Sequence, residues 1–246
     1  MTFPVWIAVG PWRLHPHAVF ELLAYASGVA LYLALRRRRG DAISDAHRWS
    51  VLTATIVGAA IGSRLLAWFE SPAADGVIEA FGGKTIVGGL LGGWIGTELE
   101  KVRLGIRQST GDLYVYPLVV GIAIGRIGCF LSGLPDRTYG TATTLPWAVD
   151  FGDGVTRHPT ALYESLFVLV LGAALWRVES RLAPGQLFRM FMSAYLAFRV
   201  AVDTIKPGLP VALGLTAIQW ACVIGALYSA WLLSRKEAVV ALRGTS

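Results

Sequence analysis

The sequence carries little charge for its length. Only 15% of its 246 residues are Asp, Glu, Lys or Arg, whereas 54% are hydrophobic. A soluble domain usually carries about 25% charged residues, so this composition excludes an ordinary soluble fold. The mean hydropathy of +0.56 agrees. The nine tryptophans and 28 glycines suit a membrane bundle, in which aromatics lie at the interfaces and glycines at helix contacts.

Cysteine and histidine are also scarce. The two cysteines, Cys129 and Cys222, lie in apolar segments, where we expect buried small side chains and no disulfide. The four histidines and two cysteines show no ligand-like spacing along the chain, so the sequence predicts no metal site. No Walker lysine follows the glycines of residues 88–96, which excludes a nucleotide-binding loop.

The sequence also lacks the features of a signal peptide and of a nucleic-acid-binding protein. The first ten residues, MTFPVWIAVG, lack a basic n-region, so we expect no removable signal peptide. The net charge of +6 is compatible with a protein that binds nucleic acid. No nucleic-acid motif accompanies it, however, and the basic residues fall between apolar segments, so we expect no nucleic-acid partner.

Seven stretches are apolar and long enough to be considered as membrane helices, which need roughly 20 residues. They are residues 17–35, 50–69, 85–99, 113–132, 158–176, 186–205 and 211–233. The third stretch is short and rich in glycine. We therefore predict an all-α, multi-pass membrane protein with about seven spans, forming a single integral-membrane domain over residues 1–246.

Basic residues are unevenly distributed between alternate loops. One set of loops and the C-terminal tail hold Arg36, Arg37, Arg38, Arg39, Arg48, Lys101, Arg103, Arg107, Arg177, Arg181, Arg189, Arg235, Lys236 and Arg243; the opposite loops hold Arg13, Lys84, Arg137, Arg157 and Lys206. The positive-inside rule places the first set in the cytoplasm. The N-terminus is then outside and the C-terminus inside, which requires an odd number of spans.

Three arginines fall inside predicted spans: Arg64, Arg126 and Arg199. Charge within a membrane is costly and usually marks function. Each arginine lies in the last third of a helix predicted to run outward, so we expect all three near the outer face at similar depth. The alternative is structural, since an arginine near a helix end usually extends to the interface.

Other polar residues extend this predicted layer. His17 lies near the outer end of the first helix, and His158 opens the fifth, followed by Tyr163 and Glu164. Asp203 follows an intramembrane arginine by four residues, which also allows a structural ion pair. Such a basic layer predicts a site for an anionic lipid headgroup, because arginine binds phosphate bidentately.

The densest motif surrounds Arg126, which Gly125 and Gly128 flank and Cys129 follows. Glycines let backbone approach closely and leave room for a bulky ligand, although helix packing alone also explains them. The motif resembles the glycine-arginine-x-glycine-asparagine/cysteine-phenylalanine signature of the prolipoprotein diacylglyceryl transferases of bacterial inner membranes.

Further segments resemble that family in order over about residues 12–233. They are Gly62-Ser63-Arg64, the pair Gly88 and Gly89, Gly140, the segment from His158 through Tyr163 to Glu164, the segment from Phe198 through Arg199 to Asp203, and Gln219. Two positions depart from the family pattern. Val87 stands where the family often has a histidine, and His17 lies at or near the place of a tyrosine. The sequence thus resembles a divergent branch, whose reaction or acceptor can differ.

The resemblance implies an enzyme. The family moves the diacylglyceryl group of phosphatidylglycerol to the lipobox cysteine thiol of a prolipoprotein signal peptide, releases glycerol phosphate and needs no cofactor. Arg126 and Arg199 would bind the phosphate, and His17 or His158 would accept the thiol proton. His158 can alternatively bond only nearby backbone. The implied substrate-binding residues are Arg64, Gly88, Gly89, Gly125, Gly128, Cys129, Gly140, Tyr163, Glu164 and Asp203.

A non-catalytic phospholipid-binding or translocating membrane protein is the rival hypothesis. Val87 favours that rival, whereas Arg126, Arg199 and His158 favour the enzyme. A small-molecule transporter is less well supported, because the sequence shows no inverted repeat. Residues 133–157 are predicted to lie outside, where they form either a lid over the site or a surface loop without a role.

Overall fold

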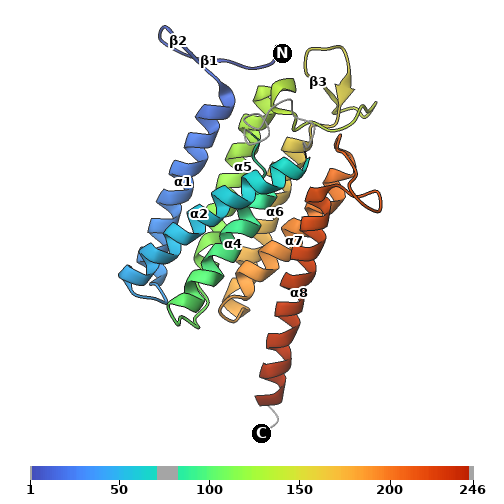
Figure 1. The fold of residues 1–246 in the computed structure, drawn as a ribbon. Helices are drawn as coiled ribbons and strands as arrows, with labels where there is room; N and C mark the ends of the chain where they lie inside the picture. The colour runs from blue at the N-terminus through green and yellow to red at the C-terminus, as the bar shows by residue number, and fades with distance from the viewer. Residues whose placement is uncertain (1, 71–82, 244–246) are drawn as a thin grey trace. The chain divides into compact units, whose positions relative to one another are not determined.

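The computed structural model describes residues 2–70 and 83–243 and is mostly helical (Figure 1). The long helices are α1 (Pro16–Arg39), α2 (Asp45–Glu70), α4 (Ile86–Arg103), α5 (Val115–Ser132), α6 (Thr160–Val178), α7 (Gln186–Asp203) and α8 (Ala217–Arg243). Each of the seven predicted stretches is therefore helical. Two short hairpins pair β1 (Ile7–Val9) with β2 (Trp12–Leu14) and β3 (Val149–Asp150) with β4 (Thr156–Arg157).

Five of the described helical segments are long and apolar enough to cross a membrane. They correspond to α1, α2, α5, α6 and α8, and they confirm the expectation of a multi-pass, all-α membrane protein. The two remaining helices, α4 and α7, are 18 residues long. Helix α4 contains Glu98, Glu100, Lys101 and Arg103, and α7 contains Arg189, Arg199 and Asp203.

Contacts divide the chain into two compact units. The first unit comprises Met1–Gly40, Gly111–Phe191 and Ala201–Pro207, and the second comprises Asp41–Thr110, Met192–Val200 and Gly208–Ser246. In the first unit α5 packs against both α1 and α6. Its core includes Val119 and Val168, and Val119 lies against Gly172, where an added Cβ would meet the valine side chain at 2.7 Å.

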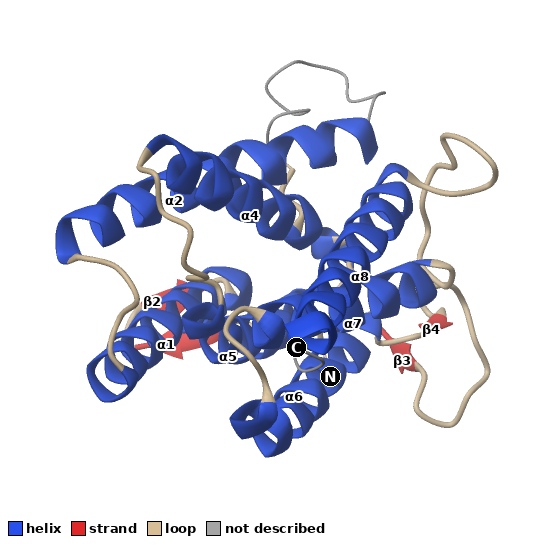
Figure 2. Ribbon diagram, turned by 90° about the horizontal axis from the view of Figure 1, so that it is seen from below, coloured by secondary structure: helices blue, strands red, loops and turns tan. Residues whose placement is uncertain are grey.

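The second unit is built on a close pairing of α2 with α4, which lie side by side in Figures 1 and 2. Gly58 and Gly62 of α2 face Gly92 and Gly88 of α4 so closely that a Cβ on any of them would overlap backbone of the partner helix. Small residues four apart allow this approach between membrane helices. The predicted substrate-binding residue Gly88 thus lies in a helix contact, whereas an added Cβ at Gly89 would make only ordinary van der Waals contacts.

The start of α4 is fixed to α2 by hydrogen bonds. Thr85 precedes the helix, and its hydroxyl accepts from the backbone N–H of Gly88 at 3.1 Å. The Thr85 backbone N–H donates to Ser63 Oγ at 3.0 Å, and Ser63 Oγ donates to the Thr85 carbonyl at 2.9 Å. A threonine N-cap of this kind stabilises a helix by about 1 kcal/mol.

We predict that Gly92→Ala destabilises the protein, whereas Gly93→Ala, one residue along the same helix, does not. A Cβ at Gly92 would overlap backbone of Gly58 and Gly62, which cannot move as a side chain can, while a Cβ at Gly93 would make contacts of 3.4 Å. The expected loss for Gly92→Ala is about 1–3 kcal/mol. Gly93→Ala should change stability by less than about 1 kcal/mol, since alanine favours the helix.

Thermal unfolding in one detergent, followed by tryptophan fluorescence, measures this difference. Equal melting temperatures for the two variants would contradict the close α2–α4 packing.

Candidate active site

A buried ion pair joins Arg126 of α5 to Glu164 of α6. Arg126 is 6% exposed and Glu164 is fully buried. Arg126 Nη2 donates to Glu164 Oε1 at 2.9 Å and lies 2.8 Å from Oε2. Removing one partner of such a pair typically costs about 3–5 kcal/mol, because the other charge stays buried. The structure therefore brings together two residues that the sequence predicted separately as site residues.

Arg126 also faces the C-terminal end of its own helix. Its Nη1 atom lies 3.9 Å from Cys129 Sγ, one turn further along α5. A guanidinium carries five N–H donors in a fixed plane. A single carboxylate cannot accept hydrogen bonds from all of them. The geometry therefore suits a group that binds a phosphate while a carboxylate holds it in place.

Cys129 is close to a second polar pair, formed by His17 at the start of α1 and Asp136 in the short helix η2 (Leu134–Asp136). His17 Nδ1 lies 2.9 Å from Asp136 Oδ1 and 4.0 Å from Cys129 Sγ. Burial acts to raise the pKa of the Asp136 carboxyl, but hydrogen bonds from His17 and Cys129 outweigh it and hold that pKa below its usual range. Asp136 is consequently a carboxylate at neutral pH.

Glycines bring these segments into contact. Gly128 of α5 lies against Phe20 of α1, so closely that an added Cβ would be 2.6 Å from Phe20 Cβ. Gly133 ends α5 with a φ of 68°, a backbone conformation that side chains disfavour, and turns the chain into η2. These two glycines therefore place His17 and Asp136 beside the end of α5.

The sequence did not identify Asp136 as a site residue. Its position is determined by the turn at Gly133, and its partner His17 comes from a helix far away in the sequence. The local signal was weak: an acidic residue that follows Gly133, the last residue of the glycine-rich arginine motif, after Leu134 and Pro135.

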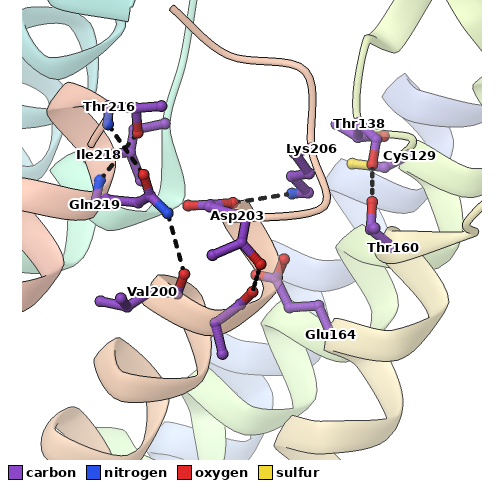
Figure 3. Close-up of polar contacts among 12 residues, drawn as sticks. Cys129, Thr138, Thr160, Glu164, Val200, Asp203, Lys206, Thr216, Ile218 and Gln219 are labelled. Atoms are coloured by element: carbon purple, nitrogen blue, oxygen red, sulfur yellow. Dashed lines mark hydrogen bonds and ion pairs between the residues drawn. The ribbon is translucent and has the colours of Figure 1, made fainter. Parts of the chain in front are cut away.

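The segment that follows is fixed at its start to α6 and to the end of α7. The Thr160 hydroxyl donates to the Thr138 carbonyl at 2.6 Å (Figure 3). Gly140 N–H donates to the His158 carbonyl at 2.8 Å, and Thr141 N–H to the Ile205 carbonyl at 2.7 Å. A Cβ at Gly140 would clash with His158, Thr160 and the Ile205 carbonyl, so this position requires glycine.

His158 lies in a second polar group, which includes Tyr163 and Trp147. His158 Nδ1 is 3.2 Å from the Tyr163 hydroxyl, and Trp147 Nε1 donates to the same hydroxyl at 2.7 Å. Phe151 is buried against Phe3, Phe130 and Tyr139. Residues 133–157 are thus held at several points, which fits both alternatives for this segment, a cover and a passive loop.

A small, mostly apolar pocket lies in the first unit next to Cys129. It is lined by Cys129, Phe130, Gly133, Thr138, Tyr139, Phe151, Pro159, Thr160 and Ala161. The end of α5, the following loop and the start of α6 supply these residues.

The remaining predicted residues lie in different places. Asp203, in the first unit, is buried and its Oδ1 lies 3.7 Å from Lys206 Nζ (Figure 3). Arg199, in the second unit, is buried, whereas Arg64 on α2 is exposed. Gln219 Nε2 donates to the Val200 carbonyl at 3.3 Å and so ties α8 to α7 within the second unit (Figure 3).

Two glycines of the arginine motif should respond differently to alanine. A Cβ at Gly128 would press on Phe20, whereas the nearest atom to a Cβ at Gly125 is 4.0 Å away. We predict that Gly128→Ala lowers stability by about 1–3 kcal/mol and that Gly125→Ala leaves the melting temperature nearly unchanged. Loss of turnover in folded Gly125→Ala would mark space used by a substrate; a large loss of stability in Gly125→Ala would contradict the packing described here.

Comparison with known proteins gives one consistent family. A family model described as prolipoprotein diacylglyceryl transferase matches residues 4–235. A phosphatidylglycerol–prolipoprotein diacylglyceryl transferase of Bordetella parapertussis is 36% identical over 245 residues, which covers 88% of each chain. A protein of the same name from Chromohalobacter salexigens is 35% identical over 88% of this chain and 84% of its own length. Another, from Nitratidesulfovibrio vulgaris (Miyazaki F), is 34% identical over 88% of this chain and 85% of its own length.

Proposed function

This chain belongs to the prolipoprotein diacylglyceryl transferase family, and we propose that its buried Arg126–Glu164 pair is the centre that binds the phosphate of phosphatidylglycerol. The activity is diacylglyceryl transfer from phosphatidylglycerol to a prolipoprotein, a step of lipoprotein biosynthesis. The acceptor group in our proposal is the thiol of the lipobox cysteine. The names of the relatives do not favour the rival hypothesis of a non-catalytic lipid-binding protein.

We further propose where the reaction takes place. The chain acts as one integral-membrane domain with seven spans in the bacterial inner membrane, its N-terminus outside and its active site towards the outer leaflet. The uneven distribution of basic residues between alternate loops supports this orientation. The five apolar helices support membrane insertion, and α4 and α7 supply the two additional spans.

The chemistry defines what the site has to do. The acceptor sulfur attacks the glyceryl carbon that bears the phosphate, so a C–S bond forms and the C–O bond breaks. The electron pair of that bond leaves on the phosphate oxygen of glycerol phosphate, and the thiol proton passes to an acceptor. Negative charge thus builds on the phosphate, where fixed cationic donors stabilise the transition state most effectively.

Arg126 is best placed for that role because it is buried and held by Glu164. Arg199, also buried, is proposed as the second phosphate-binding cation. Arg64 is proposed to bind the headgroup from the exposed face of α2. The other proposed substrate-binding residues are Gly88, Gly89, Gly125, Gly128, Cys129, Gly140, Tyr163 and Asp203.

Two histidines are the candidates for accepting the thiol proton. His158 bonds Tyr163, which is itself held by Trp147. His17 bonds Asp136, which lies beside Cys129. Both side chains belong to the first unit, as does Arg126, and both are exposed enough for an acceptor to approach.

The decisive assay combines purified protein, phosphatidylglycerol and a lipoprotein signal peptide that contains its cysteine. Mass spectrometry should detect the diacylglyceryl adduct on the peptide, and no adduct on the same peptide with serine in place of cysteine. Absence of adduct from folded protein that binds the lipid would overturn the proposal and favour the binding-protein alternative.

Arg126→Ala and Arg199→Ala should each reduce turnover by about 10²-fold or more, since each removes charge stabilisation of the leaving phosphate. Arg177→Ala is the matched control, because Arg177 is an exposed α6 arginine that bonds the Ala173 carbonyl of its own helix. Near-normal turnover in folded Arg126→Ala would remove this residue from the site. A comparable loss in Arg177→Ala would show that the effect is not specific.

A further inference from the structure

A chain of hydrogen bonds links three side chains of the first unit, Trp147, Tyr163 and His158. Trp147 Nε1 donates to the Tyr163 hydroxyl at 2.7 Å, and the same hydroxyl lies 3.2 Å from His158 Nδ1. The rings of His158 and Tyr163 meet edge to face, with their centroids 6.0 Å apart. One phenolic oxygen thus lies between an indole and an imidazole.

The β3–β4 hairpin explains why Trp147 and His158 meet. Its register pairs Val149 with Arg157. Trp147 precedes the first strand by one residue, and His158 directly follows the second strand. Neighbouring antiparallel strands therefore bring the two residues to the same end of the hairpin. A turn over residues 145–148, closed by a backbone hydrogen bond of 2.9 Å, contains Trp147.

The backbone of His158 is held on both sides. Its N–H donates to the Thr141 carbonyl at 3.2 Å, and its carbonyl accepts from the N–H groups of Gly140 and Thr160 at 2.8 and 2.9 Å. A Cβ at Gly140 would be 2.7 Å from His158 Cβ, so the two chain segments are in close contact. The imidazole therefore extends from a fixed point, and its bond to Tyr163 sets its orientation.

The donors and acceptors in this chain define where the hydroxyl proton lies. An indole N–H only donates, so Trp147 occupies one acceptor position of the Tyr163 oxygen. If His158 donated to the same oxygen, the Tyr163 proton would have no acceptor among these three side chains. If Nδ1 accepts that proton, all three groups are satisfied. His158 is then the tautomer with its proton on Nε2, and the Nδ1 lone pair is directed at Tyr163.

The phenolic oxygen lies at an accessible place beside the proposed phosphate-binding centre. Trp147 is 56% exposed, and Tyr163 and His158 are partly exposed. Glu164, the next residue of α6, holds Arg126. The start of α6 therefore carries both the hydroxyl and the carboxylate that positions the arginine. An acceptor thiol that attacks a lipid held by Arg126 has to approach this part of α6.

His17 is the other candidate for accepting the thiol proton, but carboxylates face both of its ring nitrogens. Its Nδ1 donates to Asp136 Oδ1 at 2.9 Å, and its Nε2 lies 3.8 Å from Glu21 Oε2. A nitrogen that donates a proton has no lone pair to accept another. A carboxylate beside the other nitrogen would repel a thiolate formed there. The hydrogen-bond pattern therefore favours His158.

We propose that Tyr163 and His158 form a proton relay for the acceptor thiol of the prolipoprotein, with Trp147 as a positioning residue. This inference rests on the proposed function and identifies how its nucleophile is formed. The acceptor S–H gives its proton to the Tyr163 oxygen while the Tyr163 hydroxyl gives its own proton to His158 Nδ1. The relay leaves a thiolate, a neutral tyrosine and an imidazolium.

The transfer step then balances in atoms and charge. The thiolate attacks the glyceryl carbon and forms C–S, and the C–O bond breaks with its electron pair on the departing glycerol phosphate. During the relay the Tyr163 oxygen carries partial negative charge, which the Trp147 N–H stabilises through its hydrogen bond. The imidazolium of His158 is partly exposed, so it loses its additional proton to water before the next turnover.

An acceptor that needs no base tests the relay. The nucleophile of the cysteine peptide is its thiolate, whereas a selenocysteine in its place is already ionised at neutral pH. Tyr163→Phe and His158→Asn should each lower kcat with the cysteine peptide by about 10²-fold or more, the usual contribution of a general base. Both variants should modify the selenocysteine peptide nearly as fast as the unaltered protein does.

Trp147→Phe should have a smaller effect, because it removes one hydrogen bond and leaves the relay in place. We expect kcat with the cysteine peptide to fall by about 2- to 10-fold, which corresponds to the loss of one neutral hydrogen bond. Tyr25→Phe and Trp176→Phe are the matched controls, since both residues are exposed, on α1 and α6. Neither control should change transfer to either peptide.

Comparison of the two peptides separates the relay from the proposed function. Near-normal transfer to the cysteine peptide by folded Tyr163→Phe would overturn the relay and leave the transferase function intact. Equal losses with both peptides would overturn it as well, because Tyr163 would then only support the structure. Arg126→Ala should stay slow with both peptides, since it acts on the phosphate. No adduct on either peptide from the unaltered protein would instead overturn the proposed function.

Discussion

The active site depends on the cost of burying an arginine in a membrane protein. Arg126 is nearly inaccessible within an apolar helix, and Glu164 on the neighbouring helix compensates its charge. Neither residue can be removed without leaving the other charge buried. The pair therefore fixes α5 against α6 and at the same time presents a guanidinium whose geometry matches a phosphate. In the proposed mechanism, stability and phosphate binding therefore use the same contact.

Glycine plays a different structural role in each of the two units. In the second unit, Gly58, Gly62, Gly88 and Gly92 bring the backbones of α2 and α4 together. In the first unit, Gly128 and Gly133 place α1 and the segment after α5 beside Cys129. The first set requires only that no side chain is present, which is a packing requirement. The second set also determines which polar groups meet at the site.

Much of the helical architecture could be predicted from the sequence, because apolar stretches of about 20 residues are a strong signal. The predicted ends of the helices were less accurate. The last helix was expected from residue 211, but Val211 and Ala212 form backbone hydrogen bonds with Leu215 in a turn, and α8 begins at Ala217. Glu164 was predicted as a site residue, although its pairing with Arg126 was not. The His17–Cys129–Asp136 cluster could not be predicted, because its members come from segments that only packing brings together.

The central claim is that Arg126 and Glu164 act as one unit in phosphate release. It is tested most directly by a double-mutant cycle on the kcat/KM for release of glycerol phosphate from phosphatidylglycerol, using Arg126→Lys, Glu164→Gln and the double variant. Residues that act as a unit show coupling of about 0.5–3 kcal/mol. We predict that the double variant is little slower than the slower single variant. If the free-energy losses calculated from kcat/KM for the two single variants simply add in the double variant, the account is contradicted.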